Sequence, residues 1–270
     1  MSVADTVELI CERVGHRLPT LAIVISTGLQ AVDGEVADPA IFAYAELPGF
    51  PTSTVASHKG RLLVGKLAGH SVALLESHED YYRAGRADAM RLPLEVAAGI
   101  GCDKVLLTAA AHSLRADLGP GRLALVDRHC MLGDPGQLGA GLGARYPVDS
   151  AAAYDAVLRE KVKAAAFRAD VPLGAGCFGW IAEGEFPGPR TTEGGALAQG
   201  CDMVGRSLIP EAVIARSLGL RVVALANILD WAPGAAPGGV SPDLARQRAD
   251  FGAVNLRRLL AEFLAQGGAD

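Results

Sequence analysis

Apolar residues recur along this chain with two different spacings, which predict two kinds of element. Near-helical spacing of Val3, Val7, Ile10 and Val14 predicts an amphipathic helix over residues 3–16, which Pro19 ends. Short continuous apolar runs are typical of buried strands. Such runs predict strands over residues 21–26, 62–67, 72–75, 105–111, 123–126, 177–182 and 221–229, with a hairpin turn at residues 68–70.

Further helical patterns alternate with these strands. Residues 87–100 are predicted to be helical with a kink at Pro93, residues 151–167 and 242–266 form amphipathic patterns, and Pro210 opens another helix. Strands that alternate with helices indicate an α/β fold around a mixed sheet. Residues 127–149 and 232–240 are rich in Gly and Pro without a regular pattern, so we expect loops there that are either functional or disordered.

Composition and charge exclude several classes of protein. With 270 residues and half of them hydrophobic, the chain suits one large domain spanning residues 1–270. A net charge of −5 and the absence of a Lys/Arg block argue against a nucleic-acid partner. No uncharged apolar run reaches the roughly 18 residues that a membrane span needs. The polar, acidic start has no signal-peptide profile, so we expect a cytoplasmic protein.

The cysteines point to the same compartment. The chain has five of them, widely scattered and without a Cys-x-x-Cys pair. This pattern favours reduced thiols over a disulfide framework.

The most informative segment, residues 203–230, reads as strand, helix, strand. It contains Ser207, Pro210 and Glu211, and it ends on the lone carboxylate Asp230. It resembles the Val-Gly-Met-Ser-Thr-Val-Pro-Glu-Val signature of the trimeric purine nucleoside phosphorylases and methylthioadenosine phosphorylases, with Arg206 at the position of the Met. The resemblance covers most of the chain. It implies a central mixed sheet or barrel flanked by helices, a pentosyltransferase activity and a homotrimer.

The resemblance also implies an anion site. Phosphorolysis needs donors that hold a phosphate next to the anomeric carbon while the sugar passes through an oxocarbenium-like state. It needs inorganic phosphate as co-substrate but no metal and no other cofactor. The matching segments are residues 26–30, 57–62 and 108–114, together with the signature itself. They imply phosphate contacts from Thr27, His58, His78, the backbone of Ala111, and Ser207.

One segment departs sharply from the family. In residues 76–83, His78 replaces an arginine that grips phosphate, Asp80 replaces a histidine, and Tyr82 is kept. A histidine is mostly neutral at pH 7, and an added carboxylate repels phosphate by roughly 1 kcal/mol or more at a few ångströms. We therefore expect catalytic roles for His78, Asp80 and Asp230. The alternative is that Glu76, Glu79 and Asp80 form a solvated acidic loop.

The remaining matches concern the nucleoside. Tyr82 and Arg206 are expected against the sugar, and Asp230 against N7 or the exocyclic group of the base. An ungapped count places Gly188 at the base-recognising glutamate of the family, and Arg246 falls near the residue that reaches the 5′ end of the sugar. His112 replaces a glycine, and it either crowds the phosphate or projects into the pocket as an acid, base or donor. Arg206 and Arg246 either offset the lost phosphate arginine or bind a negatively charged substrate, or both are surface arginines.

Three functions remain open at this stage. The first is a phosphorylase for purine nucleosides, including 6-amino or 5′-modified ones. The second is a related nucleoside hydrolase or natural-product tailoring enzyme, in which His78, Asp80 or His112 supports water or another nucleophile. The third is a catalytically silent homologue that binds a small molecule or partners an active subunit. A dinucleotide-dependent oxidoreductase is poorly supported, because no Gly-x-Gly-x-x-Gly follows the first strand.

Overall fold

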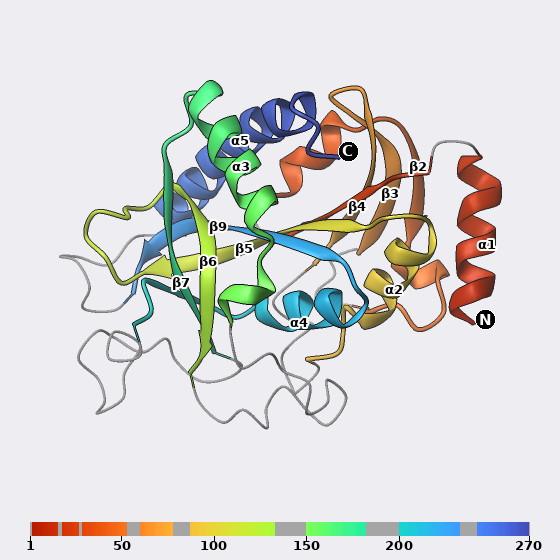
Figure 1. Cartoon of the computed structure of the whole chain (residues 1–270), viewed down its shortest axis with the longest axis horizontal. Helices are drawn as coiled ribbons and strands as arrows, with labels where there is room; N and C mark the ends of the chain where they lie inside the picture. The colour runs from red at the N-terminus through yellow and green to blue at the C-terminus, as the bar shows by residue number, and fades with distance from the viewer. Residues whose placement is uncertain are drawn as a thin grey trace.

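A mixed sheet of nine strands lies at the centre of the structure (Figure 1). This computed structural model describes residues 2–15, 18–26, 29–52, 60–77, 87–132, 150–181, 200–232 and 242–269. The strands are β1 (Leu21–Ile25), β2 (Ala37–Ala43), β3 (Arg61–Leu67), β4 (His70–Glu76), β5 (Lys104–Ser113), β6 (Leu123–Met131), β7 (Leu173–Trp180), β8 (Met203–Gly205) and β9 (Arg221–Trp231). Their order is β2-β3-β4-β1-β5-β8-β7-β6-β9.

An additional pairing of β5 with β9 closes part of this sheet into a barrel. The ring runs through β5, β8, β7, β6 and β9, and the other four strands extend it as an open sheet. Strands β4, β1, β5 and β9 are parallel neighbours, so their carboxyl ends lie at one edge. The α/β fold with a mixed sheet or barrel, expected from the sequence, is confirmed.

Helices cover both faces of the sheet (Figure 1). They are α1 (Val3–Val14), α2 (Arg91–Gly99), α3 (Ala156–Arg168), α4 (Ile209–Ser217) and α5 (Pro242–Ala265). Helix α3 packs against α5, whereas α2 packs against α1 and α4. Even α5, with 24 residues, is not apolar enough for a bilayer: no helix within the described ranges meets the requirements of a membrane span.

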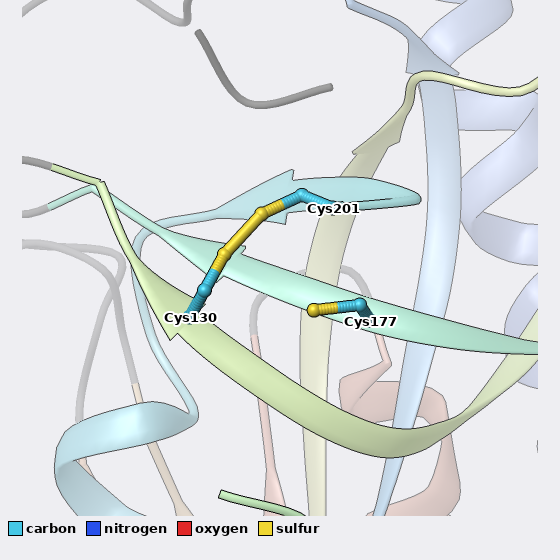
Figure 2. Close-up of side chains that lie close together, drawn as sticks. All are labelled: Cys130, Cys177 and Cys201. Carbon is cyan, nitrogen blue, oxygen red and sulfur yellow. A yellow bond between two sulfur atoms is a disulfide. The ribbon is translucent and has the colours of Figure 1, made fainter. Parts of the chain in front are cut away.

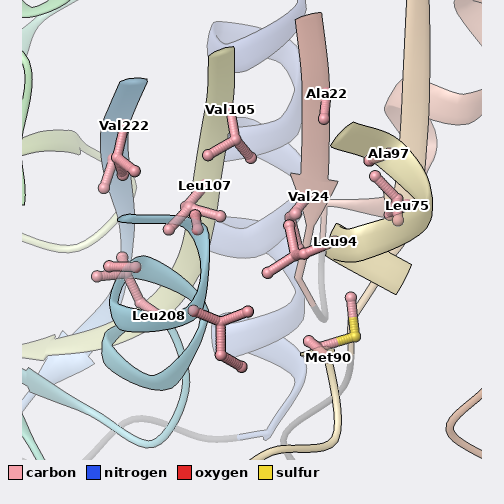
Figure 3. Packing of buried hydrophobic residues seen from close by; sticks show 14 of the residues in the cluster. Ala22, Val24, Leu75, Met90, Leu94, Ala97, Val105, Leu107, Leu208 and Val222 are labelled. Atoms are coloured by element: carbon pink, nitrogen blue, oxygen red, sulfur yellow. The ribbon is translucent and has the colours of Figure 1, made fainter. Parts of the chain in front are cut away.

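Alternating side chains along the strands build two separate cores. Ala22, Val24, Val105 and Leu107 face the core that includes Leu94 of α2 (Figure 3). Their neighbours Leu21, Ile23 and Leu106 face the other core, with Leu256 and Leu260 of α5. Strands buried on both faces carry continuous apolar runs, which is why these runs are such clear strand signals in the sequence.

Some elements differ from the sequence-based prediction. The predicted kink at Pro93 is wrong, because α2 begins at Arg91 and Pro93 therefore lies in its first turn, where the missing N–H costs nothing. β6 continues through Met131 into the predicted loop. The unpredicted β2 is a largely exposed edge strand that contains Pro39 and an irregularity in its pairing with β3.

The prediction that the cysteines are reduced thiols is wrong for one pair. A disulfide joins Cys130 to Cys201, which are 71 residues apart in the sequence, while Cys11, Cys102 and Cys177 are free. The pair meets only because β6 and the start of β8 lie on either side of β7. Sequence spacing holds no signal for such a contact.

A buried histidine makes stability depend on pH. His129 on β6 is 3% exposed, and its Nδ1 lies 2.7 Å from the Tyr154 hydroxyl. Burial lowers the pKa of His129 to about 4, from about 6.5 in an unfolded chain. The unfolded chain therefore binds more protons between these values, and the free energy of unfolding falls as the pH falls from 6.5 toward 4.

We expect the melting temperature to fall over this range in the wild type and to fall less in His129→Gln. Glutamine keeps a polar partner for Tyr154 but does not titrate. The change from His70 to Gln, at a strand end where histidine is only half-buried, is the matched control. Equal pH slopes for His129→Gln and the wild type would contradict the assignment.

Candidate functional site

Four parallel strands end at one edge of the sheet. β1 ends at Ile25, β4 at Glu76, β5 at Ser113 and β9 at Trp231. In open α/β sheets, ligands bind outside the carboxyl ends of the strands, where loops and helix starts converge. This edge is therefore the place to examine for chemistry.

A buried hydrogen-bond network fixes the start of α4 at this edge. The Ser77 hydroxyl donates to Oε1 of Glu211 (2.9 Å), and the Leu208 N–H donates to Oε2 of the same carboxylate (2.5 Å). Leu208 has a φ of 81°, a left-handed conformation that is costly for leucine. Glu211 is 1% exposed, so its two bonds hold this turn in place from within the core.

Ser207 precedes that turn and has an unused hydroxyl. β8 runs antiparallel to β5, with Val204 opposite His112. Residues after Val204 therefore continue beside the part of β5 that precedes His112. The backbone of Gly205 lies so close to β5 that an added Cβ would be 2.7 Å from the Ala110 carbonyl oxygen. Among the described residues the buried Ser207 Oγ has no hydrogen-bond partner. A buried hydroxyl costs free energy unless a ligand pairs with it, so this atom marks a binding position.

A titratable cluster lies where β5 and β9 end side by side. His112 is in register with Asp230. Burial lowers the pKa of His112, and the positive charge of Arg206 lowers it further. The Asp230 carboxylate and a hydrogen bond to the Trp231 backbone act in the opposite direction. The imidazole is therefore neutral at pH 7, with a carboxylate and a guanidinium close enough to affect its titration.

Asp230 has a second partner that the sequence did not indicate. Its Oδ1 accepts the Trp231 N–H (2.7 Å) and lies 3.6 Å from Nη1 of Arg248 on α5. The same guanidinium lies over the Trp231 ring, 5.7 Å from its centroid. The resemblance placed Arg246, two residues earlier on the same helix, near the 5′ end of the sugar and gave no role to Arg248.

Glu76 is buried in an ion pair rather than exposed in an acidic loop. Its Oε1 accepts from Nε (3.0 Å) and Nη2 (2.5 Å) of Arg61, whose Nη2 also pairs with Asp33. Glu76 is 3% exposed, and burial raises its pKa although Arg61 opposes this. The alternative of a solvated acidic segment is therefore wrong for Glu76. Glu79 and Asp80 lie outside the described residues.

The structure brings together five of the predicted site residues. Ala111, His112, Arg206, Ser207 and Asp230 all belong to β5, β9 or the turn after β8, at the same edge. The other predicted residues lie outside the described part of the chain, apart from the backbone of Arg246 in α5: Thr27, His58, His78, Asp80, Tyr82, Gly188 and the Arg246 side chain.

The chain has clear relatives among known proteins. The family model described as the phosphorylase superfamily matches residues 20–265. The chain is 26% identical over 252 residues to purine nucleoside phosphorylase 1 of Bacillus subtilis, with 92% of each chain covered. It is 32% identical over 233 residues to purine nucleoside phosphorylase of Rattus norvegicus, which covers 80% of this chain and 77% of the relative.

The fold also matches solved structures. Isoform 2 of purine nucleoside phosphorylase from Schistosoma mansoni, in complex with cytosine and ribose-1-phosphate, aligns with a TM-score of 0.82. The identity is 24%, and the alignment covers 98% of this chain and 95% of the other. At this identity the likeness shows a common fold.

Proposed function

Because the chain belongs to the phosphorylase superfamily, we propose that it cleaves the N-glycosidic bond of a purine nucleoside with inorganic phosphate as the nucleophile. The purine is a 6-amino one or part of a 5′-modified nucleoside. The proposal includes a single domain, a homotrimeric assembly and a cytoplasmic location. No metal or further cofactor takes part in the reaction.

The buried Ser207 hydroxyl, which has no hydrogen-bond partner among the described residues, carries this proposal. It precedes α4, whose N-terminus has a partial positive charge that favours anions. Arg206 adds a full positive charge at the adjacent position. A hydroxyl donor, a helix N-terminus and a guanidinium together suit an oxyanion, and the Asp230 carboxylate on β9 supplies an acceptor for a base.

The reaction follows from these positions. A phosphate oxygen forms a bond to the anomeric carbon, while the bond from that carbon to the purine nitrogen breaks and leaves its electron pair on the purine. Asp230 accepts a hydrogen bond from the exocyclic amine of a 6-aminopurine. Ser207 and Arg206 keep the phosphate next to the sugar, where positive charge develops in the transition state.

The proposal is tested by incubating the protein with adenosine, inosine and methylthioadenosine, each with and without phosphate. We expect base release that depends on phosphate and is fastest with a 6-amino substrate. Release that is independent of phosphate would favour the hydrolase alternative. No release in either condition, with thermal stabilisation by a purine, would favour a silent binding protein.

Ser207→Ala is expected to raise the KM for phosphate by about 10- to 150-fold, because one hydrogen bond to a charged group is worth roughly 1.5–3 kcal/mol. Steady-state kinetics at saturating nucleoside measures it. Ser217→Ala, at the exposed far end of α4, is the matched control. An unchanged KM for phosphate in Ser207→Ala would remove this hydroxyl from the site.

The lowered pKa of His112 predicts an acid limb in kcat/KM below pH 6.5 and no effect of this group between pH 6.5 and 8. Protonated His112 would pair with Asp230 and withdraw the carboxylate from the base. The difference between the pH profiles of wild type and His112→Asn isolates this residue from the ionisation of phosphate itself. Identical pH profiles of the wild type and His112→Asn would show that another group causes the acid limb.

A further inference from the structure

Three cysteines meet on the barrel wall. Cys130 is on β6, Cys177 is on β7, and Cys201 lies just before β8. Their sulfur atoms all lie within 4.8 Å of one another. Figure 2 shows the Cys177 thiol pointing toward the disulfide between the other two. Three adjacent strands therefore each contribute one sulfur to the same place.

The middle strand makes room for this cluster. A Cβ on Gly179 of β7 would lie 2.9 Å from the Cys201 sulfur, so only glycine leaves space at that point. Apolar residues pack around the sulfurs, namely Leu114, Ile181, Val204 and Ala232. Cys177 and Cys201 are almost fully buried, and Cys130 is partly exposed at the end of β6. The cluster therefore has a dry interior and one side that solvent reaches.

We propose that these three cysteines, when the disulfide is reduced, form a binding site for one thiophilic d10 cation, Zn²⁺ or Cu⁺. Thiolates are the ligands that such soft cations select. At a metal–sulfur distance of about 2.3 Å, two thiolates on a tetrahedral ion lie about 3.8 Å apart. To reach this geometry, the widest separation, within 4.8 Å, needs to shrink by up to about 1 Å, and the Cys130 and Cys201 sulfurs need to move apart after reduction. The Cα atoms of Cys130 and Cys201, 7.0 Å apart, leave room for an ion between their sulfurs.

Charges around the cluster act on the Cys177 thiol in both directions. Burial raises the pKa of this thiol to about 11, the carboxylates of Asp202 and Asp127 act in the same direction, and the positive charge of Arg128 opposes them, as would that of a bound cation. The neighbouring Asp202 carboxylate accepts the Cys177 N–H (2.8 Å) and pairs with Arg115, so it orients Cys177. Outer contacts of this kind fix the position of a ligand and tune the affinity of a metal site.

The disulfide and the metal-bound form exclude each other. Reduction transfers two electrons to the Cys130–Cys201 bond, for which a phosphine is a suitable donor, because water then converts it to the phosphine oxide and the two sulfurs take up protons. Binding of the cation next displaces the three thiol protons. The proposed site uses none of the residues assigned to phosphate or nucleoside, so it stands whether or not the chain is a phosphorylase.

The test uses the full chain, reduced with a phosphine under argon and freed of reductant. Zn²⁺ and Cu⁺ are titrated in separate experiments against a chromophoric chelator, and bound metal is counted by mass spectrometry. We expect one ion per chain with at least one of the two cations, and a rise in melting temperature on binding. Reduced wild-type protein that binds neither cation stoichiometrically would overturn the proposal.

Cys177→Ser is the decisive variant. It is expected to weaken binding at least about 10- to 100-fold, the loss typical of changes even in the outer contacts of a metal site. Oxidised Cys177→Ser should still form the Cys130–Cys201 disulfide, which shows by intact mass that the strands fold as before. Cys102→Ser, which removes a buried thiol elsewhere, should bind like the wild type. Equal affinity of Cys177→Ser and wild type would exclude the three-cysteine site.

Discussion

Asp230→Ala is expected to lower kcat/KM for a 6-aminopurine nucleoside by about 100- to 1,000-fold, the usual cost of losing one hydrogen-bonding group that acts on charge in a transition state. Asp230 ends the strand that lies beside His112, and its carboxylate is only partly occupied by the Trp231 N–H and Arg248. Without the carboxylate, the purine loses its acceptor, and Arg248 and Arg206 place uncompensated positive charge next to the base.

Two further variants separate recognition of the base from a general loss of structure. Asp230→Asn keeps the shape but adds an N–H donor, so we expect the ratio of kcat/KM for adenosine over that for inosine to fall by about 10-fold or more. Asp250→Ala, which removes an exposed carboxylate from α5, should leave both values unchanged. An unaltered adenosine-to-inosine ratio in Asp230→Asn would show that Asp230 does not contact the base.

Arg61→Met is expected to lower the free energy of unfolding by about 2–3 kcal/mol at pH 7.5. Breaking a buried ion pair usually costs about 3–5 kcal/mol, because the remaining charge is buried without a partner. Glu76 is 4% exposed in its side chain, whereas Arg61 is 35% exposed, so water screens part of the loss. The change in the free energy of unfolding is measured by urea denaturation of Arg61→Met, of Glu76→Gln and of the double variant. The double variant should recover most of the stability.

The pH dependence of the same variant follows from the raised pKa of Glu76. A carboxyl whose folded pKa lies above its unfolded value contributes stability at low pH, and that contribution is lost as the pH rises through the folded pKa. Without Arg61 the pKa of Glu76 rises further. The defect in Arg61→Met should therefore be largest at pH 7.5 and shrink toward pH 4.5. A defect that is equally large at both pH values would contradict a burial effect on Glu76.

The parts of the fold that the sequence predicted are those with a strong local pattern. The apolar runs of β1, β5 and β9 are buried on both faces, and Pro210 in the first turn of α4 marks the start of that helix. Edge strand β2 was not predicted, because most of its residues are exposed and Pro39 argues against a strand. The carboxyl-terminal part of β6 was not predicted, because its residues become polar there although its backbone still pairs with β7.

The site was predictable only where a motif fixed the position of a residue. Ser207, Arg206 and Asp230 could be proposed because the strand–helix–strand segment resembles the family signature. Arg248 and the burial of Glu76 depend on contacts between distant segments, α5 with β9 and β3 with β4, which no local pattern encodes. The same is true of the cysteine cluster, whose members come from three separate strands.

The chemical identity of the released sugar shows whether phosphate or water is the nucleophile. Purified protein is incubated with adenosine and phosphate, and the products are followed by ³¹P NMR and mass spectrometry. The proposed role of Ser207, Arg206 and Asp230 predicts pentose 1-phosphate, formed in equal amount to the free base and reduced in Asp230→Ala. Free pentose in its place, with the phosphate unchanged, would contradict it and assign water as the nucleophile.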